Sequence, residues 1–146
     1  MIALIQRVSA AHVEVEGTTI AAIGAGILAL VAVQPGDGEA QAERLLERML
    51  GYRVFPDAEG RMNLSLAETG GDLLLVSQFT LAADTRKGMR PGFSTAAAPA
   101  EAERWFNRLV DLAKSRHPRV EIGRFGAHMR LHLVNDGPVT FWLEAR

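Results

Sequence analysis

The 146-residue sequence contains no cysteine, which excludes disulfide bonds, a thiolate nucleophile and metal sites built from cysteine ligands. A dominant charge is also missing, because 16 basic and 17 acidic residues leave a net charge of −1. Any nucleic acid would therefore bind through a local basic patch. No apolar run approaches the roughly 20 residues of a membrane span, and Gln6 and Arg7 interrupt the apolar start, unlike in a signal peptide. These absences indicate a cytoplasmic protein without membrane contact.

Common catalytic signatures are missing as well. The four histidines are scattered, and the strand pattern at 129–134 places His128 and His132 about 13 Å apart at roughly 3.3 Å per residue, so no metal site is expected. A Ser-His-Asp triad lacks the G-x-S-x-G turn that would present its serine. The glycines at 24–26 precede a strand instead of a helix, which argues against a phosphate loop.

Length and composition predict a single globular domain over residues 1–146, with 48% hydrophobic and 23% charged residues. Apolar periodicity predicts two amphipathic helices. One has its apolar stripe at 42–50, with Asp37 as N-cap and an end at Gly51. The other starts at Pro99 and stops at Pro118.

Strands are predicted at 2–8, 12–16, 18–23, 27–33, 52–55, 73–80, 119–122, 129–134 and 139–143. The segment 135–138 is too polar and too kinked to be expected as strand. This order implies an α/β fold in which two helices pack on a mixed, β-rich sheet, and the β-rich ends of the chain form a second β layer.

Three stretches carry polar groups of possible function. Leu73–Thr80 is a buried strand that runs into Ser77, Gln78 and Thr80, which is either a ligand site or an ordinary strand end. Arg86, Lys87 and Arg90 lie in a long irregular segment, where they either bind phosphates or solvate a loop. In Asn135–Thr140, proline removes an amide donor and leaves the carbonyl of Gly137 for a ligand or partner, unless the segment is a tight turn.

Two of these stretches, 77–81 and 135–140, together resemble the paired signature of the D-aminoacyl-tRNA deacylases. The likeness continues, in order, through 6–8, 62–65, 83–86, 90–91 and 123–126. It therefore covers essentially the whole chain. Ala10 and His128 depart from the family pattern, where a basic and an acidic residue are common, so neither is assigned a role.

The resemblance implies a homodimeric hydrolase without cofactor or metal, which cleaves the ester of D-aminoacyl-tRNA, and of mischarged glycyl-tRNA, in chiral proofreading. Ser77, Gln78, Phe79 and Thr80 would line one protomer's pocket. Gly137 and Pro138, joined by a cis bond, would enter from the partner, where their carbonyls would collide with an L side chain.

Further roles follow from the same resemblance. The backbone N–H of Phe79 or Thr80 would stabilise the oxyanion, and the terminal ribose 2′-OH would assist in place of a side-chain base. Thr80 as a nucleophile is the rival mechanism. Phe125 and Met129 would border the terminal adenosine. Arg7 would brace the Gly-Pro loop or simply pack.

Arg86, Lys87 and Arg90 would contact the tRNA near its 3′ end. The alternative function is a non-catalytic homodimeric module that binds aminoacyl-tRNA or a small amino-acid ligand.

Overall fold

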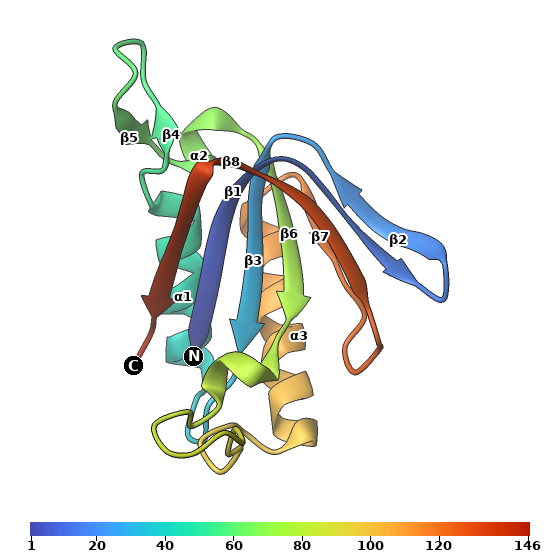
Figure 1. Cartoon of the computed structure of the whole chain (residues 1–146). Coiled ribbons are helices and arrows are strands. Elements are labelled where there is room, and N and C mark those ends of the chain that lie inside the picture. Colours follow the sequence, from blue (N-terminus) through green and yellow to red (C-terminus); the bar gives the residue numbers. More distant parts are fainter.

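A six-stranded mixed β-sheet forms the centre of the molecule in the computed structural model, which describes residues 1–146 (Figure 1). The strands are β1 (Ile2–Val15), β2 (Thr18–Ile23), β3 (Gly26–Ala32), β6 (Asp72–Ser77), β7 (Val120–Ile122) and β8 (Arg130–Glu144). Their order is β2-β1-β3-β6-β7, and β8 pairs with the other edge of β1. β1 runs antiparallel to β2, β3 and β8, whereas β3, β6 and β7 are parallel. The predicted mixed sheet is confirmed.

β1 and β8 are each one long strand, which corrects the prediction of two strands in each region. Residues 135–138, expected outside any strand, lie within β8. The pairing of β1 with β8 shifts register between Gln6 and Val8 and again between Val8 and Ala10. Such bulges increase the local twist and bend a strand without ending it. The residues between the separately predicted strands therefore mark where β1 and β8 bend, and neither strand ends there.

The bend folds one half of the sheet over the other, so the expected second β layer is confirmed (Figure 1). Val13 and Ala11 of β1 and Ile23 of β2 belong to one buried cluster with Leu28 of β3 and Leu74 of β6. The face of β3 and β6 turned away from the helices is thus covered by strands. A separate two-stranded hairpin, β4 (Phe55–Pro56) with β5 (Met62–Leu64), projects from the upper left in Figure 1. The strand predicted at 52–55 is therefore wrong except at Phe55.

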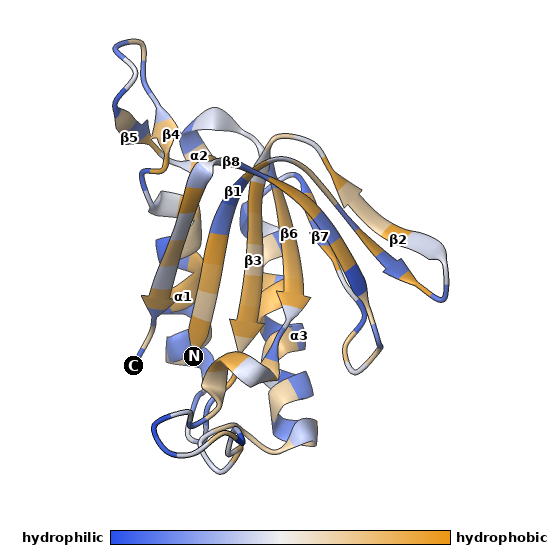
Figure 2. Ribbon diagram, in the orientation of Figure 1, coloured by the Kyte–Doolittle hydropathy of each residue, from blue (hydrophilic) through white to orange (hydrophobic).

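Two amphipathic helices cover the opposite face of the sheet, as predicted. They are α1 (Glu39–Gly51) and α3 (Pro99–Arg116), and α3 begins at the expected proline. Leu45, Leu46 and Leu109 are fully buried in a core of 23 residues that also includes Ile27 and Leu75 from the sheet. The ribbon of β3 and β6 is correspondingly apolar along its length (Figure 2). No helix is both long enough and apolar enough to cross a membrane.

Two short helices were not predicted. They are α2 (Leu66–Thr69), capped by the hydroxyl of Ser65, which accepts from the N–H of Glu68 at 3.2 Å, and a 3₁₀ helix, η1 (Phe79–Ala82). A single helical turn is too short to show apolar periodicity, so only its capping residue signals it. The 3₁₀ helix begins one residue after β6, with Gln78 as its N-cap, so the strand ends at Ser77.

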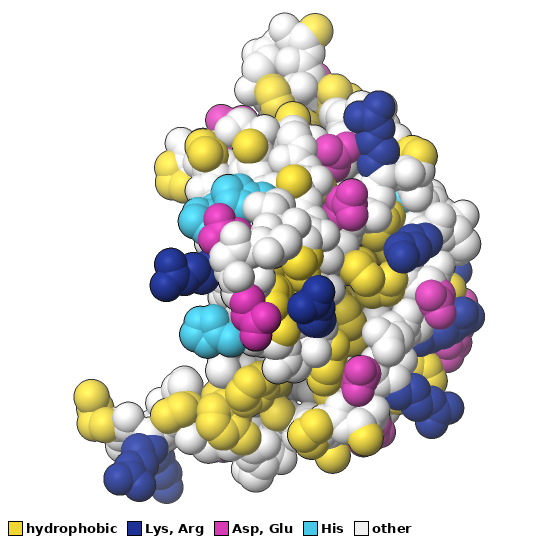
Figure 3. All heavy atoms as spheres, turned by 90° about the vertical axis from the view of Figure 1, so that its right-hand side faces the viewer, with side chains coloured by type: hydrophobic (Ala, Val, Ile, Leu, Met, Phe, Trp, Pro, Cys, Tyr) yellow, Lys and Arg dark blue, Asp and Glu magenta, His cyan; other side chains and the backbone are white.

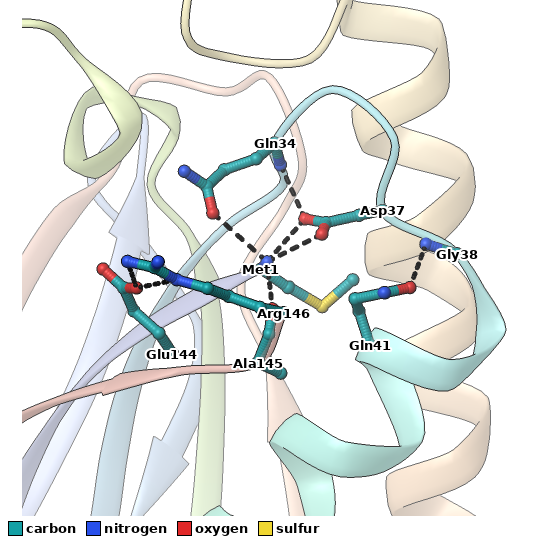
Figure 4. Close-up of polar contacts among 8 residues, drawn as sticks. All are labelled: Met1, Gln34, Asp37, Gly38, Gln41, Glu144, Ala145 and Arg146. Carbon is teal, nitrogen blue, oxygen red and sulfur yellow. Dashed lines mark hydrogen bonds and ion pairs between the residues drawn. The ribbon is translucent and has the colours of Figure 1, made fainter.

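Asp37 does not cap α1, so that prediction is wrong. The N-cap is Gly38, and the carboxylate of Asp37 instead accepts from the buried N-terminal ammonium of Met1 at 2.8 Å and from the N–H of Gln34 at 2.7 Å (Figure 4). The same ammonium donates to the carbonyl of Ala145 at 2.9 Å. A buried charge needs such partners, and this pair joins the start of β1 to the loop before α1.

Candidate active site

The carboxyl end of β6 opens into a cavity of about 460 Å³. It lies where a parallel sheet usually places its ligand sites, and eight of its 12 lining residues are hydrophobic. The lining residues are Val76, Ser77, Gln78, Phe79, Ala97, Pro99, Ala102, Phe125, Gly126, Ala127, Met129 and Leu131. The structure thus brings together Ser77, Gln78, Phe79, Phe125 and Met129, which come from two segments about 50 residues apart in the sequence.

The chain turns sharply at Gln78, beside this cavity, between β6 and η1. The N–H of Gln78 donates to the carbonyl of Val31 at 2.7 Å, and the N–H of Leu81 donates to the carbonyl of Gln78 at 3.2 Å, which closes the first turn of η1. The first N–H groups of a helix have no partner within it, and no turn, loop or cap hydrogen bond uses the N–H of Phe79 or Thr80. Two backbone donors are therefore available beside the cavity.

Side chains in this turn have few polar partners. The amide of Gln78 donates to the hydroxyl of Thr80, and no histidine or carboxylate is hydrogen-bonded to that hydroxyl. Phe79 is 56% exposed and packs against Phe93, with 5.1 Å between ring centroids. None of the 12 residues that line the cavity titrates. The residues that line the cavity in this chain therefore supply no side-chain acid or base.

Gly137 and Pro138 are joined by a cis peptide bond, as the sequence resemblance implied. Gly137 has φ of +141°, and an added Cβ would meet Cγ2 of Val139 at 2.6 Å, so only glycine fits there. Asp136 precedes this pair, and its carbonyl accepts a hydrogen bond from the guanidinium of Arg7 at 2.9 Å. The same guanidinium donates to the carbonyl of Val54 at 2.7 Å. Arg7 thus contacts the Gly-Pro segment directly.

The Gly-Pro segment does not line the cavity of its own chain. Both residues are exposed on β8, which pairs only with β1 and leaves its second edge open. Val134 and Trp142 of the same strand are 59% and 48% exposed, respectively, so this strand presents two large apolar side chains to solvent. Within one chain, the two sequence motifs, 77–81 and 135–140, therefore lie in separate places.

The basic residues Arg86, Lys87 and Arg90 line one polar depression with Asp84. Their segment is closed at its base by paired backbone hydrogen bonds between Asp84 and Gly92, at 2.7 and 2.9 Å. Arg86 forms a two-pronged ion pair with Asp84, at 2.8 and 2.7 Å, and this hydrogen bonding holds the pKa of Asp84 far below its usual value. Lys87 and Arg90 form no ion pair within the chain and are free to bind an anion.

Sequence reasoning missed two sets of residues. Pro99 and Ala102, at the start of α3, line the cavity although they were expected only as helix residues, and so does Ala97, just before the helix, for which no role was expected. It also missed that His132 lies beside His12 and Glu14 on the curled half of the sheet. Both sets depend on contacts between segments distant in sequence, for which the chain carries no local signal.

Comparison with known proteins gives consistent matches over the full length. The model of the family described as D-Tyr-tRNA(Tyr) deacylase matches residues 4–144. Proteins called D-aminoacyl-tRNA deacylase from Methylococcus capsulatus and Thioalkalivibrio sulfidiphilus are 66% and 67% identical over 144 residues. They cover 99% of this chain and 94% and 97% of their own lengths. The protein of that name from Azotobacter vinelandii is 64% identical over 145 residues, with 99% and 100% covered.

Two solved structures resemble the fold. A c-Myc DNA unwinding element binding protein superposes with a TM-score of 0.95 at 38% identity, covering 100% of this chain and 99% of its own. A probable eukaryotic D-amino acid tRNA deacylase superposes with a TM-score of 0.75 at 19% identity, covering 98% of each chain. The second likeness concerns the fold alone.

Proposed function

Because this chain belongs to the D-Tyr-tRNA(Tyr) deacylase family, we propose that the cavity at the end of β6 is where it hydrolyses the ester bond of D-aminoacyl-tRNA. The products are the free D-amino acid and tRNA, so the reaction removes D-amino acids before they enter translation. Glycyl-tRNA fits the same scheme, because glycine has no side chain to be excluded.

The main support for this mechanism is that the cavity has no titratable side chains in its lining and lies next to two free backbone N–H groups. An aminoacyl ester is already activated, so a positioned water and an oxyanion donor are sufficient for hydrolysis. The N–H of Phe79 or Thr80 is that donor, and one such donor is worth roughly 10²–10³ in rate. The ribose 2′-OH beside the ester is the hydroxyl that assists proton transfer.

Chiral selection is assigned to Gly137 and Pro138 of a second copy of the chain. Three features support a dimer whose partner completes the site: the open edge of β8, the exposed Val134 and Trp142, and the absence of the Gly-Pro pair from its own cavity. The Gly-Pro carbonyls would face the α-carbon of the bound amino acid, where an L side chain would collide with them. Arg7 would keep the pair in place through its hydrogen bond to Asp136.

The remaining predicted site residues would bind the 3′ end of the tRNA. Phe125 and Met129 line the same cavity as Ser77, and their apolar surfaces suit the terminal adenine ring. Lys87 and Arg90 offer unpaired charges to the phosphates of the acceptor end. Arg86 is held by Asp84, so its part would be weaker unless the tRNA displaces that carboxylate.

The test is hydrolysis of the same tRNA charged with the D or the L form of one amino acid. We expect release of the D-amino acid only. A Gly137→Ala variant, in which the added Cβ displaces the segment, should lose selectivity by cleaving the L ester, whereas Asn107→Ala on the outer face of α3 should behave as wild type. Binding of both forms without turnover would instead identify a non-catalytic binding module.

A further inference from the structure

Two histidines and a glutamate converge on the outer face of the curled half of the sheet, away from the cavity. His12 and Glu14 lie on β1, and His132 lies on β8. One carboxylate oxygen of Glu14 is 3.3 Å from Nε2 of His12 and 3.4 Å from Nε2 of His132. The two imidazole rings stack with 4.2 Å between centroids and 7° between planes. Histidine and acidic side chains accordingly gather at the left edge of the face in Figure 3.

Strand geometry explains why these three side chains meet. His12 is directly opposite His132 in the antiparallel register of β1 and β8, and Glu14 points to the same side because it is two residues from His12. Both strands are paired throughout this region, so the donor atoms sit on a rigid support. The sequence alone does not show the cluster, because His12 and His132 are 120 residues apart.

The spacing of the donor atoms fits tetrahedral coordination. Zinc binds imidazole nitrogen and carboxylate oxygen at about 2.0–2.2 Å, which places the donors of a tetrahedral site roughly 3.3–3.5 Å apart. The separations of 3.3 and 3.4 Å between Glu14 and the two histidines match this value. All the donor atoms lie within 4.8 Å of one another. The two imidazole planes are nearly parallel, so the rings must tilt out of their stack for both nitrogens to point at one ion.

We propose that His12, Glu14 and His132 form a binding site for one divalent transition-metal ion of the Zn²⁺ class, with water as the fourth ligand. Two imidazoles favour such ions over Mg²⁺ or Ca²⁺, which prefer oxygen ligands. The side chains are 38%, 26% and 49% exposed, so an ion enters without unfolding. The bound ion would clamp β1 to β8 upstream of the Gly-Pro segment.

Neighbouring charges modulate this affinity. Arg130 is opposite Glu14 in the strand register and opposes a bound cation. Glu16 and His128 line an adjacent depression with Glu14 and Arg130, and the charge of Glu16 offsets that of Arg130. His128 lies outside the group of three donors. It is therefore a matched control on the same surface.

The test uses untagged, full-length protein stripped with a chelator and titrated with Zn²⁺ by calorimetry, with metal content measured after desalting. We expect one ion per chain in the wild type and in His128→Gln, and binding at least about tenfold weaker in His12→Gln, Glu14→Gln and His132→Gln. Binding only to the folded state raises the midpoint of thermal unfolding, so Zn²⁺ should raise Tm in the first two proteins alone.

Each metal-free variant is first unfolded by heat without Zn²⁺. A cooperative transition shows that the variant is folded, so weaker Zn²⁺ binding then reflects the lost metal-binding side chain. The site is refuted by a wild type that binds no stoichiometric ion. Undiminished binding in His12→Gln and His132→Gln refutes it equally, and so does a His128→Gln variant that loses the ion with them.

Discussion

The hydroxyl group of Thr80 accepts a hydrogen bond from the amide of Gln78, and no histidine or carboxylate is hydrogen-bonded to it, so we expect that it does not act as a nucleophile. Its backbone N–H survives substitution. We therefore expect Thr80→Ala to lower kcat/KM for D-aminoacyl-tRNA by less than about tenfold, well short of the roughly 10²–10³ that one oxyanion donor contributes. Thr80→Ser is the control. A fall to the uncatalysed rate in Thr80→Ala alone would establish the nucleophilic mechanism.

The Asp84 carboxyl provides a test by pH. Hydrogen bonding to Arg86 lowers its pKa, so the pair stabilises the folded protein above the pKa of unfolded aspartate and loses this contribution as pH falls through the lower folded value. In Arg86→Gln we expect the pKa of Asp84 to rise toward about 3.9. Carbon NMR of the Asp84 carboxyl group as a function of pH measures this change. The lowered pKa of Asp57 comes from Asn63 and should stay unchanged. An unchanged Asp84 would show that Arg86 is not its partner in solution.

At the scale of elements, α3 joins the core to the cavity. Leu109 is fully buried against the sheet, whereas Ala102, one turn from the start of the helix, lines the cavity. Leu109→Ala should lower the free energy of unfolding by about 2–5 kcal/mol, because it leaves a hole in a packed core. Denaturant unfolding measures this change.

Asn107→Ala, on the exposed face of the same helix, is the control for that substitution and should stay within about 0.5 kcal/mol of wild type. Equal losses in both variants would indicate a helix effect, not a packing effect.

The prediction of strands from sequence missed the full length of β1 and β8. Alternation in 12–16 and 129–134 identified strand correctly except at Glu16 and Met129, but β1 and β8 were each divided in two. Asn135 explains the error in β8. Its side chain accepts from the N–H of Val139 at 3.0 Å and donates to the hydroxyl of Thr140 at 2.9 Å, so side-chain bonds support a segment whose composition indicates a turn.

For the whole molecule, the proposed dimer places Gly137 and Pro138 beside the cavity of another chain. The absence of native cysteine makes this testable with single-cysteine variants, Ala127→Cys in the cavity and Asp136→Cys beside the Gly-Pro pair. A short bismaleimide should link the two in a mixture of variants and give a species of twice the 15.8 kDa chain mass.

Peptide mass spectrometry would assign this link to residues 127 and 136 of two chains. Asn107→Cys, on the outer face of α3, should give no such product with either variant. A 127–136 link formed only within single chains of a doubly substituted protein would contradict a shared site.

The sequence by itself determined the two amphipathic helices, most strands, the mixed α/β class and the two motifs that identify the family, because periodicity and short motifs are properties of neighbouring residues. Only the tertiary structure decided that Phe125 and Met129 meet Ser77 in one cavity and that His132 faces His12. It also decided that Asp37 binds the N-terminus instead of capping a helix. These outcomes depend on strand register and on packing between distant segments, and such contacts leave no pattern in either segment alone.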